Sequence, residues 1–158
     1  YNIFERGVEQ DVLPYCREKG ISTLAYGALC RGLLTGKMNP ETKFSGDDLR
    51  KTDPKFQEPR YARYLEAAAG LARLARERHG RDLLHLAVRF ILDRGASVAL
   101  WGARHPDQMD PLPGVFGWTL SGEEMEEIDR ILEGTVPEPV GSEFMAPPAR
   151  EGVSPGDA

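Results

Sequence analysis

The 158-residue sequence has few cysteines, no long uninterrupted apolar run and no excess of basic charge. Its two cysteines, Cys16 and Cys30, are too few for a disulfide framework and have no metal-type partner nearby in sequence, so a cytoplasmic location and no bound metal are expected. The longest apolar stretch, around residues 83–92, is interrupted by Arg89 and is too short to span a membrane. With 20 basic and 25 acidic residues, the formal net charge is −5, which argues against nucleic-acid binding.

The two ends of the sequence differ in composition. The opening residues, YNIF, are apolar and aromatic without a polar lead-in, as if they lay inside a structural element, and they lack the pattern of a signal peptide. From Thr135 onward the sequence is rich in proline, glycine and acidic residues, which is typical of flexible chain. We therefore expect a folded domain at residues 1–134 and a flexible tail at 135–158.

Apolar periodicity and turn residues predict helices that alternate with strands. Helices are expected at residues 11–19, 59–78 and 82–94 and from Ser121, where Ser121 and Glu124 form a capping box. The first helix is expected to bury Val12, Leu13, Tyr15 and Cys16. Between residues 38 and 58 the chain makes a polar excursion with Phe44 and Phe56 as aromatic anchors.

Two strands are predicted, at residues 21–26 and 96–102. The second strand is a continuous apolar run, which favours a parallel strand that is covered on both faces. Strands that alternate with helices indicate a parallel α/β sheet or barrel. In both architectures ligands bind where the strands end, so we expect the segments after the two strands to face the same ligand.

The segment after the first strand, YGALCRGLLTGK, contains three glycines within ten residues. A glycine-rich backbone can bring its N–H groups close to phosphate oxygens. The spacing of Gly27, Gly32 and Gly36 fits neither G-x-x-x-x-G-K-[ST] nor G-x-G-x-x-G, and a plain turn that needs positive φ remains the alternative. The cations Arg31 and Lys37 are candidates for phosphate contact.

Four stretches of the sequence, in order, resemble the aldo-keto reductase family. They are YNIFER (1–6), LPYCREKGISTLAYGALCRGLLTGK (13–37), AVRFILDRGASVALWGAR (87–104) and QMDPL with GWTLSGEEM (108–125). The resemblance implies an α/β fold of the (β/α)8 TIM-barrel type. It also implies that the chain is a partial barrel, the C-terminal half, with the end of strand six and strands seven and eight with their helices.

The resemblance also implies a cofactor site for NADP. Tyr1 matches the aromatic residue that stacks on the nicotinamide. The segment that wraps the pyrophosphate matches Gly27, Ala28, Leu29, Arg31, Gly32 and Leu33. The loop that meets the adenosine 2′-phosphate matches Gly102, Ala103 and Arg104, and Gln108 matches a residue at the adenosine end. Where the family often has an asparagine four residues after this glutamine, the present sequence has Leu112.

The family's catalytic tetrad of Asp, Tyr, Lys and His has no counterpart in these 158 residues. We therefore assign no catalytic residue, and we expect this chain alone to be inactive although the whole enzyme would reduce a small carbonyl substrate with NADPH. A few strands cannot close a barrel, so we also expect self-association, association with an N-terminal half, or marginal stability.

Two alternatives remain open. Besides the C-terminal half of a reductase, the chain can be a non-catalytic NADP-binding or assembly module derived from a truncated barrel. It can also be part of a different α/β barrel that binds a phosphorylated substrate with the same two loops.

Overall fold

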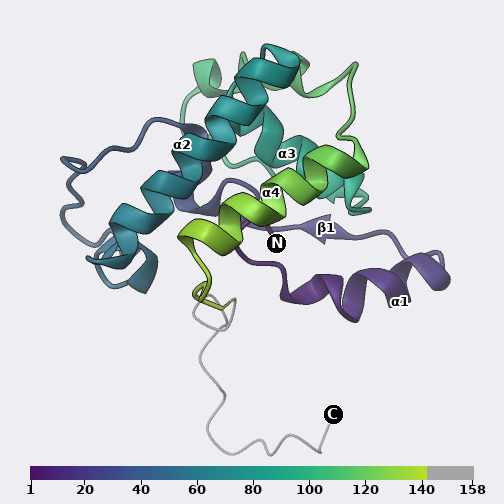
Figure 1. Ribbon diagram of the computed structural model, residues 1–158, viewed down its shortest axis with the longest axis horizontal. Helices are drawn as coiled ribbons and strands as arrows, with labels where there is room; N and C mark the ends of the chain where they lie inside the picture. Colours follow the sequence, from purple (N-terminus) through teal and green to yellow (C-terminus); the bar gives the residue numbers. More distant parts are fainter. Residues whose placement is uncertain (142–158) are drawn as a thin grey trace, which may run out of the picture.

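The structure, a computed structural model, describes residues 1–141; the rest of the predicted tail, residues 142–158, lies outside the described residues. Four α-helices and a pair of short strands form its main elements (Figure 1). They are α1 (Val12–Glu18), β1 (Leu24–Ala25), α2 (Arg60–His79), α3 (Leu83–Asp93), β2 (Val98–Ala99) and α4 (Gly122–Thr135). Six 3-10 helices lie between them: η1 (Gly7–Glu9), η2 (Cys30–Thr35), η3 (Leu49–Lys51), η4 (Pro54–Phe56), η5 (Pro106–Met109) and η6 (Leu112–Val115).

Helices α2, α3 and α4 pack on one another and enclose most of the core. The predicted helix at 59–78 is confirmed as α2, which packs against both α3 and α4. Its buried side chains recur every three or four residues, the spacing of one helix face. They are Tyr61, Tyr64, Ala67, Ala68, Leu71, Leu74 and Ala75.

The predicted ends of α3 and α4 are also found. Nearly every residue of α3 is buried, as its almost continuous apolar sequence indicates, and Gly95 follows its end with a φ of 104°. At the start of α4, the Glu124 N–H donates to Ser121 Oγ (3.2 Å) and the Ser121 N–H donates to Glu124 Oε2 (2.8 Å). These bonds form the predicted capping box, and Ile128 anchors α4 with a fully buried side chain.

The two strands are parallel neighbours but are much shorter than predicted. Leu24 is opposite Val98 and Ala25 is opposite Ala99. The prediction that the second strand is covered on both faces is wrong, because Val98 is 43% exposed and Leu100 is 42% exposed. The reason is that each strand has a single partner within the described residues. Helix α3 packs against β2, and Ala25 is buried in the core, but Val98 and Leu100 stay exposed.

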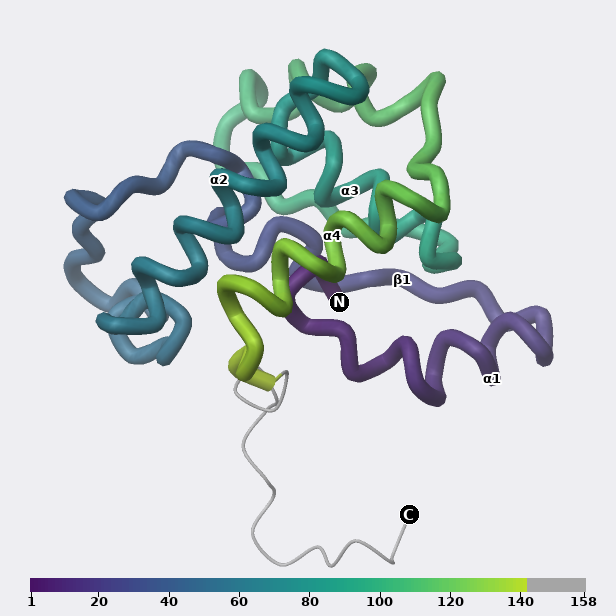
Figure 2. The backbone as a smooth tube through the Cα atoms, viewed as in Figure 1, coloured from purple at the N-terminus to yellow at the C-terminus, as the bar shows by residue number. Residues whose placement is uncertain are grey.

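Helix α1 lies apart from the α2–α4 group, below β1 in the view of Figure 2. Pro14 lies in its first turn, where the missing N–H of proline breaks no helical hydrogen bond. The predicted buried face is wrong, however: Leu13 is buried, whereas Val12 is 48% and Tyr15 57% exposed and Cys16 is half-buried. Within residues 1–141, η1 packs against α1 and Arg17 donates to the Arg94 carbonyl (3.0 Å), and these contacts leave Val12 and Tyr15 exposed.

Beyond α4, residues 136–141 return toward α2. Val136 is buried, and the Val140 N–H donates to the Tyr64 hydroxyl (2.9 Å). Within the described part of the chain, no helix has both the length and the apolar character needed to cross a membrane.

Candidate functional site

The parallel pairing of β1 and β2 brings the two predicted ligand loops to the same edge of the sheet. The Leu100 N–H donates to the Ala25 carbonyl (2.9 Å), so the chain is still paired where both strands end. Gly27 follows the first strand by two residues and Gly102 follows the second by three. We refer to residues 26–37 as the glycine-rich loop and to residues 102–108 as the Arg104 loop. The structure therefore places these two loops as neighbours.

The glycine-rich loop has an unusual backbone. Besides Gly27, Gly32 and Gly36, the non-glycine residues Cys30 and Arg31 have positive φ values of 46° and 52°. Each such residue costs roughly 1–2 kcal/mol relative to a right-handed conformation, so the turn is held by its surroundings. Three hydrogen bonds close it, from the N–H of Cys30 to the Gly27 carbonyl (2.9 Å) and from the N–H groups of Gly32 and Leu34 to the Leu29 carbonyl (2.9 and 3.2 Å).

The residues of this loop differ in their exposure to solvent. Ala28 and Leu33 are buried, whereas Gly27, Leu29 and Gly32 are half-buried. A ligand on the surface of the loop would therefore meet mainly peptide groups at these positions, as expected for a loop that binds phosphate through its backbone.

The first residues of the chain lie against this loop. The amino group of Tyr1 donates to the Tyr26 carbonyl (2.7 Å), and Asn2 Nδ2 donates to the Gly27 carbonyl (3.1 Å). The Tyr1 hydroxyl donates to Glu9 Oε1 (2.6 Å), and burial, followed by this bond, raises the pKa of Tyr1 well above its usual range. The half-buried Tyr1 is thus fixed next to the loop by contacts at both ends.

Arg31 turns toward the protein interior. Its Nη1 lies 3.6 Å from Asp53 Oδ2, and Asp53 is fully buried. Lys55 Nζ lies 3.2 Å from the same oxygen and donates to Glu5 Oε1 (2.8 Å). Burial works against the charge on Lys55, but the hydrogen bond and the charge of Glu5 outweigh it and raise the pKa of Lys55. We refer to Glu5, Arg31, Asp53 and Lys55 as the buried charge cluster.

The segment after β2 is exposed from Gly102 to Asp107 and folds over the side chain of Gln108. Gln108 Oε1 accepts hydrogen bonds from the Arg104 N–H (2.6 Å) and the His105 N–H (3.2 Å). The carboxamide oxygen of Gln108 therefore holds the backbone turn at Arg104 and His105, while the Arg104 side chain is exposed.

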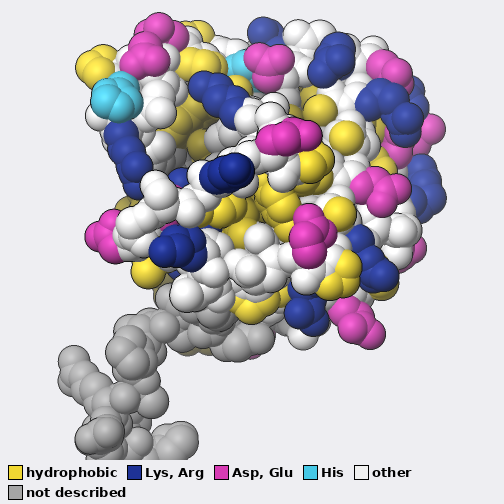
Figure 3. Space-filling model, turned by 90° about the vertical axis from the view of Figure 1, so that its left-hand side faces the viewer, with side chains coloured by type: hydrophobic (Ala, Val, Ile, Leu, Met, Phe, Trp, Pro, Cys, Tyr) yellow, Lys and Arg dark blue, Asp and Glu magenta, His cyan; other side chains and the backbone are white. Residues whose placement is uncertain are grey.

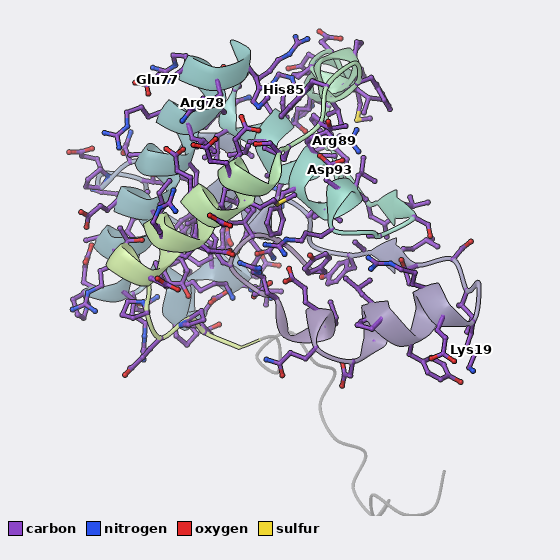
Figure 4. All side chains as sticks on the ribbon, turned by 45° about the vertical axis from the view of Figure 1, so that its right-hand side comes forward. Lys19, Glu77, Arg78, His85, Arg89 and Asp93 are labelled. Carbon is purple, nitrogen blue, oxygen red and sulfur yellow. The ribbon has the colours of Figure 1, made fainter. Side chains whose placement is uncertain are left out.

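His85, near the N-terminus of α3 and labelled in Figure 4, contacts the chain just beyond this segment. It is a buried, hydrogen-bonded histidine: Nδ1 accepts from the Asp82 N–H (3.2 Å) and Nε2 lies 2.9 Å from the Pro111 carbonyl. The ring packs so closely on Gly114 that a Cβ atom there would lie 2.5 Å from His85 Nε2. One buried side chain thus joins α3 to the chain that follows Gln108.

The excursion at 38–58 packs beside the glycine-rich loop. Phe44 contacts Phe56 edge to face with ring centroids 5.3 Å apart, so the predicted aromatic anchors are confirmed. The Arg50 guanidinium lies over the Phe44 ring, and its Nη1 donates to the Arg31 carbonyl (3.4 Å). The hydrogen bonds of Arg50, followed by more distant charges that include Arg104, lower the pKa of Asp48 to about 2.

Charges of both signs surround apolar side chains on the face shown in Figure 3.

Sequence reasoning missed two parts of this region. It assigned no role to the Tyr26 ring, which is 64% exposed at the end of β1 directly before Gly27. It also missed the buried charge cluster, for which the only local signal is Asp53 before Pro54, a helix-capping pattern. Among residues 1–141, His, Cys, Asp and Glu side chains form no group that fits a metal ion.

Comparisons of the sequence with known proteins point to one family. A family model described as the aldo/keto reductase family matches residues 1–133. Aldo-keto reductase YhdN from Bacillus subtilis is 56% identical over 154 residues, which cover 97% of this chain and 46% of that protein. Aldo-keto reductase str7 from Strobilurus tenacellus is 28% identical over 123 residues, which cover 77% of this chain and 36% of that protein.

Solved structures give the same result. A glycerol dehydrogenase from Gluconobacter oxydans superposes with a TM-score of 0.84 at 51% identity, covering 92% of this chain and 44% of that one. The holo form of an aldo-keto reductase from Bacillus halodurans has a TM-score of 0.61 at 24% identity, covering 83% of this chain and 40% of that one, and supports the fold alone. The chain therefore spans less than half the length of these relatives.

These neighbours have the (β/α)8-barrel fold, and two parallel strands with their helices are consistent with part of such a barrel. With a family model matching residues 1–133 and a relative that is 56% identical along nearly the whole chain, this protein belongs to the aldo/keto reductase family.

Proposed function

We propose that this chain carries the dinucleotide-binding part of an NADP-dependent aldo-keto reductase. In the whole enzyme, hydride would pass between NADPH and a small carbonyl compound. The observation that carries the proposal is the position of the glycine-rich loop and the Arg104 loop, which leave two paired parallel strands at the same edge. Ligands of α/β folds bind at this edge.

The two loops divide the cofactor between them in this proposal. Peptide groups of residues 27–33 bind the pyrophosphate, because the side chains of Ala28 and Leu33 point inward. Arg104, which is exposed, binds the 2′-phosphate and thereby favours NADP over NAD. Gln108 holds the Arg104 turn by the two bonds to its carboxamide oxygen, and Gly102 and Ala103 leave room for the adenosine.

Two aromatic rings are candidates for the nicotinamide. Tyr1 is the one that the family resemblance indicates, but its hydroxyl is held by Glu9 and its ring is half-buried. The Tyr26 ring is more exposed and directly precedes the pyrophosphate loop. Tyr1→Ala and Tyr26→Ala variants separate the two roles, because only the stacking residue should weaken binding of nicotinamide mononucleotide.

The catalytic tetrad is assigned to residues outside this sequence, and the chain is proposed to be the C-terminal half of the barrel. Its strand edges are apolar and open: Leu24 is 63% exposed and Val98 is 43% exposed. In the complete enzyme these side chains would be covered by the remaining strands or by a second copy. The glycerol dehydrogenase relative makes glycerol the first alcohol to test in the oxidative direction.

The experiment is a fluorescence titration of the protein with NADPH and with NADH. Saturable binding that prefers NADPH, and that Arg104→Ala weakens at least tenfold, supports the proposal, since one charged hydrogen bond contributes roughly 1.5–3 kcal/mol. Arg73→Ala is the matched control, because Arg73 is an exposed arginine in the middle of α2.

Other outcomes favour the alternatives. Binding without turnover after the catalytic half is supplied favours the non-catalytic module. A preference for sugar phosphates over dinucleotides favours the other α/β barrel. Loss of NADPH and NADH binding by equal factors in Arg104→Ala would contradict the 2′-phosphate role.

A further inference from the structure

The buried charge cluster joins three segments that are distant in sequence. Glu5 comes from the first residues, Arg31 from the glycine-rich loop, and Asp53 and Lys55 from η4 in the excursion. The side chains of Asp53 and Lys55 are 0% and 1% exposed, and that of Glu5 is 8% exposed. Two carboxylates and two cations balance, so the cluster as a whole is neutral, as charges removed from water require.

Asp53 is the centre of this cluster. Its Oδ2 faces both Lys55 Nζ (3.2 Å) and Arg31 Nη1 (3.6 Å), while its Oδ1 accepts the Lys55 N–H (3.0 Å). Lys55 is in turn fixed by Glu5 at 2.8 Å. The position of Asp53 is therefore set from two sides, and Arg31 is the member of the cluster that belongs to the proposed pyrophosphate loop.

The backbone of that loop needs such support. Cys30 and Arg31 have positive φ without being glycine, so the turn would relax if nothing opposed it. The excursion holds Arg31 at two points, at its guanidinium through Asp53 and at its carbonyl through Arg50 Nη1. An arginine directed at a buried carboxylate is also poorly placed to serve as a phosphate ligand in the solvent.

We infer that Asp53 is a positioning residue for cofactor binding, which acts through Arg31 to hold the Cys30–Gly32 turn in its strained conformation. The expected effect on cofactor binding rests on the proposed function. The inference assigns Arg31 a structural role in place of direct phosphate contact. Neutralising Asp53 removes the carboxylate that Arg31 faces. Because the Arg31 side chain is 19% exposed, it can turn toward water, and the turn then loses the support that Asp53 gives it, while Lys55 keeps Glu5.

The first measurement is amide hydrogen exchange without any cofactor, on the wild type and on Asp53→Asn. The N–H groups of Cys30, Gly32 and Leu34 are hydrogen-bonded within the turn and report its opening. We expect them to exchange at least tenfold faster in the variant, with unchanged rates in the middle of α3. Asp47→Asn is the matched control, because Asp47 is an exposed aspartate in the same excursion and should leave every rate unchanged.

The second measurement is a double-mutant cycle on NADPH affinity. If Asp53 acts through Arg31, Asp53→Asn and Arg31→Ala each weaken NADPH binding about fivefold or more, and the double variant is no weaker than the worse single one. Additive losses would mean that Arg31 contacts phosphate independently and would overturn the inference. Arg31→Lys, which keeps the charge, should recover part of the affinity.

The two measurements separate this inference from the function on which it rests. If the wild type binds no NADPH, the proposed function fails, and the exchange rates still decide whether Asp53 holds the turn. Unchanged exchange at Cys30, Gly32 and Leu34 in Asp53→Asn would refute the inference even if cofactor binding is intact. Should Asp53→Asn fail to fold, Arg31→Ala at the partly exposed end of the cluster gives the same exchange test.

Discussion

Replacing Gly114 by alanine tests the packing of η6 on α3 most directly. The added Cβ would lie 2.5 Å from His85 Nε2 and 2.8 Å from Cδ2, well inside van der Waals contact. The ring has little freedom to retreat, because it is buried and hydrogen-bonded at both nitrogens. Either η6 shifts away from α3, or the ring moves and gives up its bond to the Pro111 carbonyl.

The magnitude follows from these contacts. Forcing one methyl group into a packed site costs about 1–3 kcal/mol, and leaving a buried polar group without its hydrogen bond costs about 1–3 kcal/mol more. We therefore expect Gly114→Ala to lower the free energy of unfolding by about 3 kcal/mol, or the melting temperature by roughly 6–12 °C for a chain of this size. Urea unfolding followed by circular dichroism measures the first quantity and a thermal scan the second.

Gly134→Ala is the matched control, because it makes the same chemical change in α4 where a new Cβ meets no atom within 4 Å. There, alanine should stabilise the helix by up to about 1 kcal/mol. The two variants are thus expected to differ in sign. If Gly114→Ala were as stable as the wild type, the close packing of His85 on Gly114 would be wrong, and with it the role of His85 in joining α3 to the chain after Gln108.

Three further changes probe α4 and the chain around it. Ile128→Ala removes a fully buried side chain and should cost about 2–5 kcal/mol in urea unfolding. Burial alone would raise the pKa of Glu124, but the α4 cap bonds and His79, whose Nε2 lies 2.7 Å away, lower it overall. Its contribution to stability is therefore complete above its usual pKa of 4.5 and is lost as the pH falls further, so Glu124→Gln should flatten this part of the stability–pH curve. Tyr64→Phe removes the acceptor of the Val140 N–H and should cost about 1 kcal/mol, without the larger loss expected for Ile128→Ala.

Local signals in the sequence predict the helices well. The end of α2 at His79 and the capping box at Ser121 depend on residues within a few positions of each other, so periodicity and capping chemistry suffice. The strands are shorter than predicted because a strand lasts only as far as its neighbour pairs with it, and within residues 1–141 β1 and β2 pair only with each other. The prediction of a buried face on α1 failed for a similar reason. Burial of a helix face depends on a partner element, and the sequence of the helix does not contain that information.

The candidate site was predictable only in outline. The glycines and the alternation of strands and helices indicate two loops at one edge, and the structure brings these loops together. The direction of the Arg31 side chain was not predictable, because its partner Asp53 lies 22 positions away in an excursion without regular periodicity. The assignments of Tyr1, Arg104 and Gln108 to the cofactor stay predictions, which the titrations described above will decide.

The neutrality of the buried charge cluster also constrains how this protein can vary. A single substitution at Glu5 or Lys55 leaves an unbalanced charge in the interior, a change that commonly costs about 3–5 kcal/mol and consumes much of a typical domain's stability. Relatives should therefore either keep the acidic and basic positions together or replace them together with apolar residues. Positions 5 and 55, which form an ion pair here, are therefore expected to covary among homologues, although they are about fifty positions apart in the sequence.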